Sequence, residues 1–115
     1  MKRENADGLV IIQGSLMNSH SKKIAELAAA NRLPSIGEPP HYANNGCLMS
    51  YEPNLDDLGA RGAIFVDKIL KGAKPAVLPA EQPRRFDLLI NLQTAKQIGL
   101  AIPPHVLARA DRVIR

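Results

Sequence analysis

The order of three segments near the N-terminus constrains the fold of this chain more than any other feature. Residues 8–12 form a short, continuously apolar and β-branched run, which is typical of a buried strand in a parallel sheet. Residues 21–31 have the apolar spacing of a helix, and residues 34–37 predict a second short strand. A strand, a helix and a strand in this order predict a right-handed crossover and therefore a parallel sheet.

The middle of the chain predicts a loop, a third strand and the longest helix. Residues 38–46 are rich in Pro, Asn and Gly and predict a loop, and residues 47–51 predict a short strand. Asn54 is a favourable N-cap for a helix over residues 55–71, and Gly72 is placed to end it.

A proline-rich segment separates this helix from the C-terminal part. The prolines of residues 73–83 predict an extended connector. Residues 86–91 predict a strand, and short helices are expected over residues 92–98 and 104–110. The alternation of strands and helices makes the predicted fold class α/β.

The predicted sheet is thin. Parallel sheets are normally buried on both faces, but one long helix and a few short ones leave little to cover them. We therefore expect a partial parallel sheet with flanking helices. Its uncovered surface is apolar, so self-association through that surface is a possible consequence.

Composition and charge narrow the classes of partner. Apolar residues make up 45% of the chain, which is enough for a packed core, whereas aromatic residues make up only 3% and Trp is absent. Few aromatic faces argue against a base-stacking platform. The net charge is +4, but the basic residues are scattered among acids, so no nucleic-acid partner is expected.

The N-terminal residues bear on localisation. A charged segment, residues 1–7, precedes an apolar run of four residues, 9–12. A signal peptide needs an apolar region of about 7 to 15 residues, and a membrane-spanning helix needs about 20. The chain as written is therefore expected to be cytoplasmic, with no direct membrane insertion.

No enzyme signature emerges from the sequence. Ser15 and Ser50 follow strands and His20 or His41 could act as bases, but the sequence around Ser15 lacks the G-x-S-x-G pattern of a nucleophile elbow. Cys47 is the single cysteine and the three histidines are far apart, so no metal site is expected. We expect neither catalysis nor a cofactor.

Polar residues follow three of the predicted strands at their carboxyl ends. Ligands of open α/β sheets bind beyond these ends. The loops at residues 13–15, 37–41 and 50–54 offer hydrogen-bonding groups suited to a small polar ligand, although capping and turn roles are the alternative for each of them. The candidate ligand-binding residues are Gln13, Ser15, Glu38, Ser50 and Tyr51.

Eight segments occur in an order and spacing that are more specific than any single motif. They are residues 24–28, 32–34, 46–51, 54–58, 66–75, 78–83, 86–96 and 99–104. The strongest is Val-Asp-Lys-Ile-Leu-Lys-Gly-Ala-Lys-Pro at 66–75, leading into Leu-Pro-Ala-Glu-Gln-Pro at 78–83. With these segments the chain resembles the C-terminal portion of the periplasmic substrate-binding proteins of ABC transporters, in the branch linked to uptake of aromatic amino acids or related small molecules.

The resemblance implies a fragment of a two-lobed clamp of type I fold. Residues 1–115 would be a single partial domain. Within it, residues 8–46 would form a βαβ unit of the C-terminal lobe, and residues 47–83 a hinge strand, an N-terminal-lobe helix and a return linker. Residues 84–115 would complete the C-terminal lobe. The implied partners are a small-molecule solute and, for a full-length periplasmic relative, ABC permease subunits.

Three stretches depart from the family pattern. Residues 14–16 stand where an acidic or amide residue and an aromatic pair are usual, and Glu52 replaces a usual glycine between Tyr51 and Pro53. Residues 38–41 replace an expected short helix. Without one lobe a clamp buries much less of its ligand. We therefore expect a truncated substrate-binding component with impaired ligand binding; the alternative is a cytoplasmic protein-interaction or self-associating module with no transport role.

Overall fold

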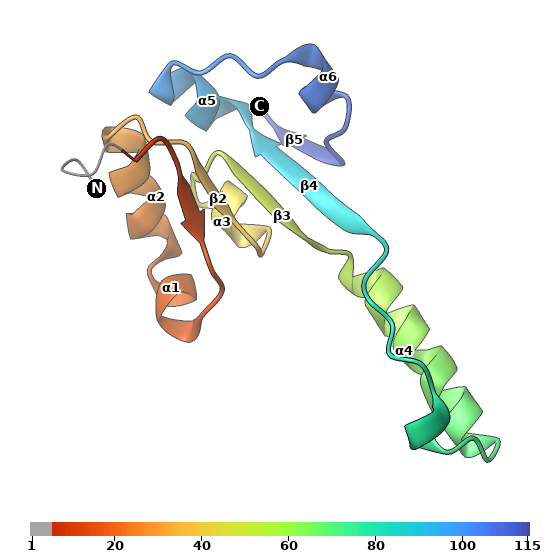
Figure 1. The fold of residues 1–115 in the computed structure, drawn as a ribbon. Coiled ribbons are helices and arrows are strands. Elements are labelled where there is room, and N and C mark those ends of the chain that lie inside the picture. Colours follow the sequence, from red (N-terminus) through yellow and green to blue (C-terminus); the bar gives the residue numbers. More distant parts are fainter. Residues whose placement is uncertain (1–5) are drawn as a thin grey trace. The chain divides into compact units, whose positions relative to one another are not determined.

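The computed structural model describes residues 6–115 (Figure 1). Most of the charged N-terminal segment on which the localisation argument rests lies outside the described residues. The chain divides into two compact units. The first comprises the chain up to Glu52 together with Asp87–Arg115, and the second is Pro53–Phe86.

A five-stranded sheet carries the first unit, with its strands in the order β1-β2-β3-β4-β5. β2 runs parallel to both β1 and β3, and β4 runs parallel to β5. The predicted α/β class, with a sheet flanked by helices, is confirmed. The strands are β1 (Leu9–Ile11), β2 (Ser35–Gly37), β3 (Met49–Pro53), β4 (Phe86–Asn91) and β5 (Arg112–Ile114).

The central pair, β3 and β4, is antiparallel. The Asn91 N–H donates to the Leu48 carbonyl at 2.8 Å, and the Asn54 N–H donates to the Arg85 carbonyl at 2.9 Å. The residue bonded to β3 and its flanking residues moves backwards along the chain, from Asn91 to Arg85, as the chain advances from Leu48 to Asn54. Neighbouring strands that pair in this way are antiparallel. The amino end of β4 therefore lies at the edge of the sheet where β1, β2 and β3 have their carboxyl ends (Figure 1).

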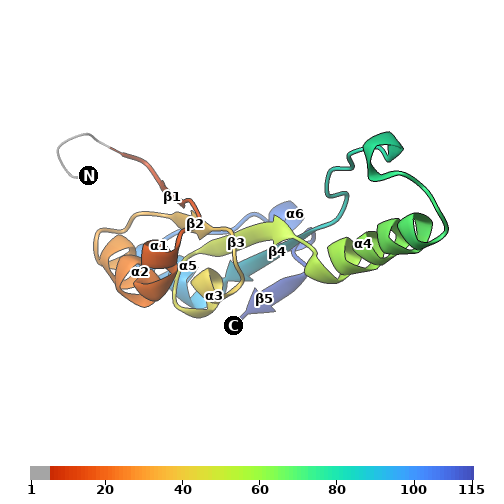
Figure 2. The same cartoon turned by 90° about the horizontal axis from the view of Figure 1, so that it is seen from below.

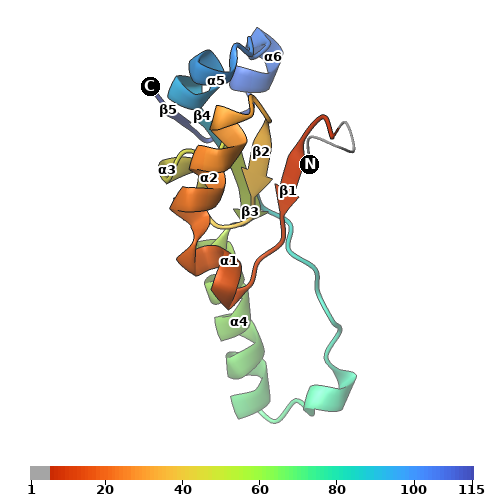
Figure 3. The same cartoon turned by 90° about the vertical axis from the view of Figure 1, so that its left-hand side faces the viewer.

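Helices cover one face of β1, β2 and β3. Figures 2 and 3 show three of them, α1, α2 and α3, on the same side of these strands. The burial of β1 agrees, since Ile11 is 5% exposed whereas its neighbour Val10 is 75% exposed. The helices of the first unit are α1 (Ser15–Ser19), α2 (Ser21–Ala30), α3 (His41–Asn44), α5 (Leu92–Ile98) and α6 (Pro104–Leu107).

Three elements differ from the sequence-based expectation. Helix α3 lies within a predicted loop, α1 begins at the last residue of the loop expected at 13–15, and β5 was not predicted at all. Residues 38–40 are not helical, and the short helix α3 begins directly after them at His41. The third strand begins at Met49, two residues later than predicted, and includes Pro53.

Small residues allow α2 to pack closely on the sheet. Its buried face includes Ala25, which packs with Ile11 and Tyr42, and Ala29, which packs with Leu48. These contacts belong to two clusters of the core, one beneath β1 and β2 and the other beneath β3 and α5. The clusters are Ile11, Ala25, Tyr42 and Cys47, and Ala29, Leu48, Ala95 and Ile98.

Tyr42 connects α3 to both β2 and α1. Its side chain is fully buried, and its hydroxyl donates to Asn18 Oδ1 of α1 at 2.9 Å. The ring lies directly on the backbone of Gly37, because a Cβ placed on Gly37 would be only 2.4 Å from Tyr42 Cγ. A glycine is therefore required at this position of β2.

Asn91 ends β4 and has two roles there. Its Oδ1 accepts from the Thr94 N–H at 3.1 Å and so caps α5, as the sequence predicted. Its Nδ2 donates to the Ala43 carbonyl at 2.9 Å, which ties β4 to α3. Gly99 follows α5 with a φ of 76°, the left-handed conformation expected where glycine ends a helix.

The second unit consists of helix α4 (Leu55–Leu70) and the connector that returns from it. Asn54 Oδ1 accepts from the Asp57 N–H at 2.8 Å, which confirms the predicted N-cap. The connector is extended except for a short 3-10 turn, Pro75–Val77, and Glu81 forms an ion pair with Arg61 of α4. Among residues 6–115, every helix is too short or too polar to span a lipid bilayer.

The contact between Gly37 and Tyr42 predicts the effect of one added methyl group. We expect Gly37→Ala to displace the Tyr42 ring and to cost about 1–3 kcal/mol or more, which lowers the melting temperature by at least about 5 °C for a unit of this size. Gly8→Ala is the matched control, because a Cβ there meets only the Pro34 carbonyl oxygen at 3.6 Å. Circular dichroism melts compare the two variants, and equal melting temperatures would contradict the prediction.

Candidate functional site

The polar residues of the first unit gather where β1, β2 and β3 end and β4 begins. Ile11, the last residue of β1, pairs with Gly37, the last residue of β2, and Gly37 pairs with Ser50, beyond which β3 continues to Pro53. We call this part of the sheet the acidic edge and define it by Glu38, Ser50, Glu52 and Asp87.

The five predicted site residues are placed differently. Glu38 directly follows β2 and is exposed, Ser50 is buried within β3, and Tyr51 is 47% exposed. The pairing of β2 with β3 brings these three residues close together at the end of β2, with Ser50 and Tyr51 on opposite faces of the sheet. Gln13 is exposed in the loop after β1, and Ser15 is the exposed first residue of α1, whose carbonyl accepts from the Ser19 hydroxyl at 2.8 Å.

Glu52 experiences the charges of its neighbours. It lies half-buried near the end of β3. Burial raises the pKa of the Glu52 carboxyl above its ordinary value, and the negative charges of Asp87 and then Glu38 raise this pKa further. Within residues 6–115 Glu52 itself takes part in no ion pair.

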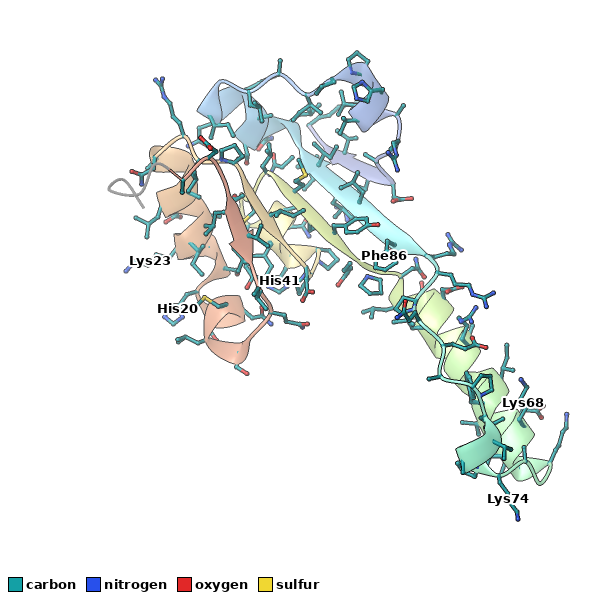
Figure 4. The ribbon with its side chains drawn as sticks, viewed as in Figure 1. His20, Lys23, His41, Lys68, Lys74 and Phe86 are labelled. Carbon is teal, nitrogen blue, oxygen red and sulfur yellow. The ribbon has the colours of Figure 1, made fainter. Side chains whose placement is uncertain are left out.

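Two polar atoms near this edge have unused hydrogen-bonding capacity. Ser50 Oγ and His41 Nε2 are buried and have no hydrogen-bond partner among the described residues. Ser50 is only 1% exposed, and the His41 ring stacks on that of Tyr42 with centroids 4.7 Å apart. Figure 4 shows His41 at the end of the sheet where β2 terminates. Nearly all buried polar groups in native proteins are hydrogen-bonded, so such atoms indicate a place where water or a ligand binds.

Three residues of this region were not among the predicted site residues. Asp87 was missed because a parallel sheet was expected, whereas the antiparallel β4 brings its amino end to this edge. Glu52 was identified only as a departure at the hinge, and His41 only as a candidate base. A charged residue directly before a proline within a strand, as in Glu52–Pro53, is the sequence signal that could have indicated the edge.

The chain was compared with protein families and with solved structures. Residues 1–114 match the family model described as ABC transporter substrate binding protein. A conserved domain protein from Vibrio cholerae is similar at 28% sequence identity with a TM-score of 0.80, covering 96% of this chain and 37% of that chain. The ABC domain in complex with L-Trp from Streptococcus pneumonia is similar at 25% identity and a TM-score of 0.80, covering 98% of this chain and 38% of that chain.

A further solved structure supports the fold alone. It is the ligand-free, open form of a substrate-binding protein with adhesive properties from Clostridium difficile, 22% identical with a TM-score of 0.77, covering 96% of this chain and 37% of that chain. The chain thus spans 37% to 38% of the length of these solved relatives. No curated protein sequence matches the chain.

The raised pKa of Glu52 predicts a pH-dependent stability. Below the pKa of Glu52 in the unfolded chain, the carboxyl is protonated in both states and has no effect. As the pH rises through the raised pKa of the folded state, the folded chain holds more protons than the unfolded chain, so the free energy of unfolding falls. Above that pKa the loss is complete.

We therefore expect Glu52→Gln to raise the melting temperature near about pH 7 and to leave it unchanged near about pH 3. Circular dichroism melts at the two pH values measure the effect. Glu26→Gln is the control, since Glu26 lies exposed on α2 away from the acidic edge. A lower melting temperature of Glu52→Gln at the higher pH would contradict the prediction.

Proposed function

The chain belongs to the ABC transporter substrate-binding protein family, and we propose that it carries part of the solute-binding site of such a protein. One observation carries the proposal: the acidic edge combines the ends of three strands and the start of a fourth with an unpartnered buried hydroxyl, Ser50 Oγ, within the described chain. The crevice beyond the strand ends is where ligands of open α/β sheets bind. Binding and release of a small solute, with no catalytic step, is the corresponding function.

We propose an aromatic or related amino acid as the solute. The Streptococcus pneumonia relative is a complex with L-Trp and is 25% identical over 98% of this chain. Tyr51 supports the same class of solute, because it is 47% exposed at the same end of the sheet, on the face of β3 opposite to Ser50. An exposed aromatic ring can pack against the side chain of such an amino acid. Gln13, Glu38 and Ser50 would supply polar contacts.

The two compact units support a division between two lobes. The chain leaves the first unit after Glu52 and returns to it at Asp87. We assign residues 8–46 and 84–115 to the C-terminal lobe of a hinged clamp. Residues 47–83 then supply a crossing strand, the helix that belongs to the N-terminal lobe and the return linker. ABC permease subunits would be the partners of a full-length periplasmic protein of this kind.

The length of the relatives bears on affinity. The chain spans 37% to 38% of their length, so most of the residues that would enclose a solute in such a protein lie outside these 115 residues. A site with fewer walls buries less of its ligand and binds it more weakly. The 115-residue chain alone is therefore expected to have impaired binding.

Titration of the ¹⁵N-labelled chain with L-Trp, followed by NMR, tests this function. We expect the amide signals of Glu38, Ser50 and Tyr51 to shift, with a dissociation constant on the order of 1 mM. The amide of Lys68 in α4 is the internal control and should not move. Shifts confined to α4, or no shift at the acidic edge with L-Trp and with a panel of other amino acids and sugars, would contradict a solute site there. A dissociation constant below about 10 µM would contradict impaired binding.

One specific observation supports a second candidate function, self-association. β1 is an edge strand of the sheet, and Val10 within it and Ile12 directly after it are 75% and 78% exposed. An apolar hollow of about 200 Å³ lies beside Val10, lined also by Ile36 and Met49. Uncovered apolar surface on an edge strand favours pairing with another chain.

Sedimentation or light scattering measures this second function. If β1 mediates self-association, the purified chain forms dimers whose fraction rises with concentration, and Val10→Lys shifts it to monomer. Leu70→Lys is the matched control, because Leu70 is 82% exposed but lies on α4 in the other unit. A folded monomer at every concentration would exclude self-association.

A further inference from the structure

We infer that Ser50 and Glu52 together bind a primary ammonium group of the solute, with Asp87 and Glu38 adding negative potential around it. The inference rests on the proposed solute-binding function and specifies which chemical group the acidic edge recognises. It assigns specificity to residues of β3 and β4, not to residues 14–16 after β1, where the resemblance implies an acidic or amide residue.

The geometry of β3 brings the two contact residues together. Successive side chains of a strand point to opposite faces, so residues two apart share a face. Ser50 and Glu52 are two apart within β3 and therefore point to the same side, whereas Tyr51 between them points to the other. The hydroxyl of Ser50 and the carboxylate of Glu52 are thus adjacent groups on one face of the strand.

The charge of this edge favours the approach of a cation. Glu52 is half-buried, and Asp87 and Glu38 are close enough to act on it electrostatically. No lysine or arginine of the described chain pairs with Glu52. A partly buried carboxylate beside two others is unfavourable unless an opposite charge approaches it. A cationic group of the solute would supply that charge.

The unpartnered hydroxyl favours an ammonium group among the possible cations. Ser50 Oγ is buried and accepts no hydrogen bond within residues 6–115, although it has two lone pairs available. An ammonium group has three donors, which can reach the hydroxyl and the carboxylate at once. A metal ion fits less well, because no group of three metal-binding side chains is assembled in the described residues.

The cost to the fold supports a role in recognition. A buried hydroxyl with no partner destabilises a protein, and an alanine at position 50 would remove that penalty. The same holds for Glu52, whose repulsion with Asp87 and Glu38 would vanish in a glutamine. Two neighbouring residues that both lower stability are expected where a binding site is built at the expense of the fold.

Two analogues of L-Trp test the inference on the 115-residue chain. Tryptamine keeps the ammonium group and lacks the carboxylate, whereas indole-3-propionate keeps the carboxylate and lacks the ammonium group. In NMR titrations we expect tryptamine to shift the amide signals of Ser50 and Glu52, and indole-3-propionate to leave them in place. Glu52→Gln should weaken tryptamine binding by about tenfold or more, and Ser50→Ala should also weaken it, because each removes a partner of a charged donor.

A stability measurement separates recognition from a structural role. Ser50→Ala and Glu52→Gln should be at least as stable as the original chain while binding tryptamine more weakly. Glu26→Gln, on the exposed face of α2, is the control and should bind tryptamine unchanged. Lower stability of Ser50→Ala together with unchanged tryptamine affinity would make its hydroxyl structural and would overturn the inference.

The outcomes also distinguish this inference from the proposed function. Equal shifts of the Ser50 and Glu52 signals with indole-3-propionate and tryptamine would overturn ammonium recognition but leave a solute site at the acidic edge. Shifts at this edge with neutral sugars alone would do the same. Absence of any shift at the edge with tryptamine, L-Trp and the solute panel would overturn both.

Discussion

The Tyr42 ring packs on the bare backbone of Gly37, and the position of α3 beside the acidic edge depends on this contact. It holds α3 against the end of β2. The Tyr42 hydroxyl also donates a hydrogen bond to Asn18 Oδ1 of α1 at 2.9 Å. The side-chain amide of Asn91, at the end of β4, donates a hydrogen bond to the Ala43 carbonyl of α3. Since α3 is a single turn of helix with little stability of its own, tertiary contacts of this kind keep it in place. They therefore position His41 at its start, at the end of the sheet where β2 terminates.

Local chemistry explains which parts of the fold could be predicted. Asn54 and Asn91 were recognisable as N-caps because an amide oxygen satisfies helix N–H groups whatever the tertiary context, and both caps are present. Gly99 was recognisable as a helix end for a similar reason. By contrast, α1 and α3 have five and four residues, too few to display a helical period. β5 has three residues, and its pairing with β4 together with the bond from the Leu88 N–H to Asp111 Oδ2 holds it in the sheet.

The same distinction applies to the candidate site. Glu38, Ser50 and Tyr51 could be placed at one edge from the sequence, because the carboxyl ends of parallel strands meet there. Asp87 could not, since its position follows from the antiparallel pairing of β3 with β4, a contact between residues far apart in the chain. Nor could the sequence indicate that the Ser50 hydroxyl is buried without a partner, because burial of a strand residue is decided by the helices that cover it.

The fold changes the interpretation of two departures from the family pattern, the residues after the first strand and Glu52. The residues after the first strand and Glu52 counted in the sequence only as departures from the family pattern. In the fold, however, Glu52 lies within electrostatic reach of Asp87 and Glu38 and next to the unpartnered hydroxyl of Ser50. Negative charge at a site acts through its summed potential and not through one fixed position. Acids at the ends of neighbouring strands can therefore supply the negative potential that the residues after β1 do not supply, which is the physical basis of the ammonium site that we propose.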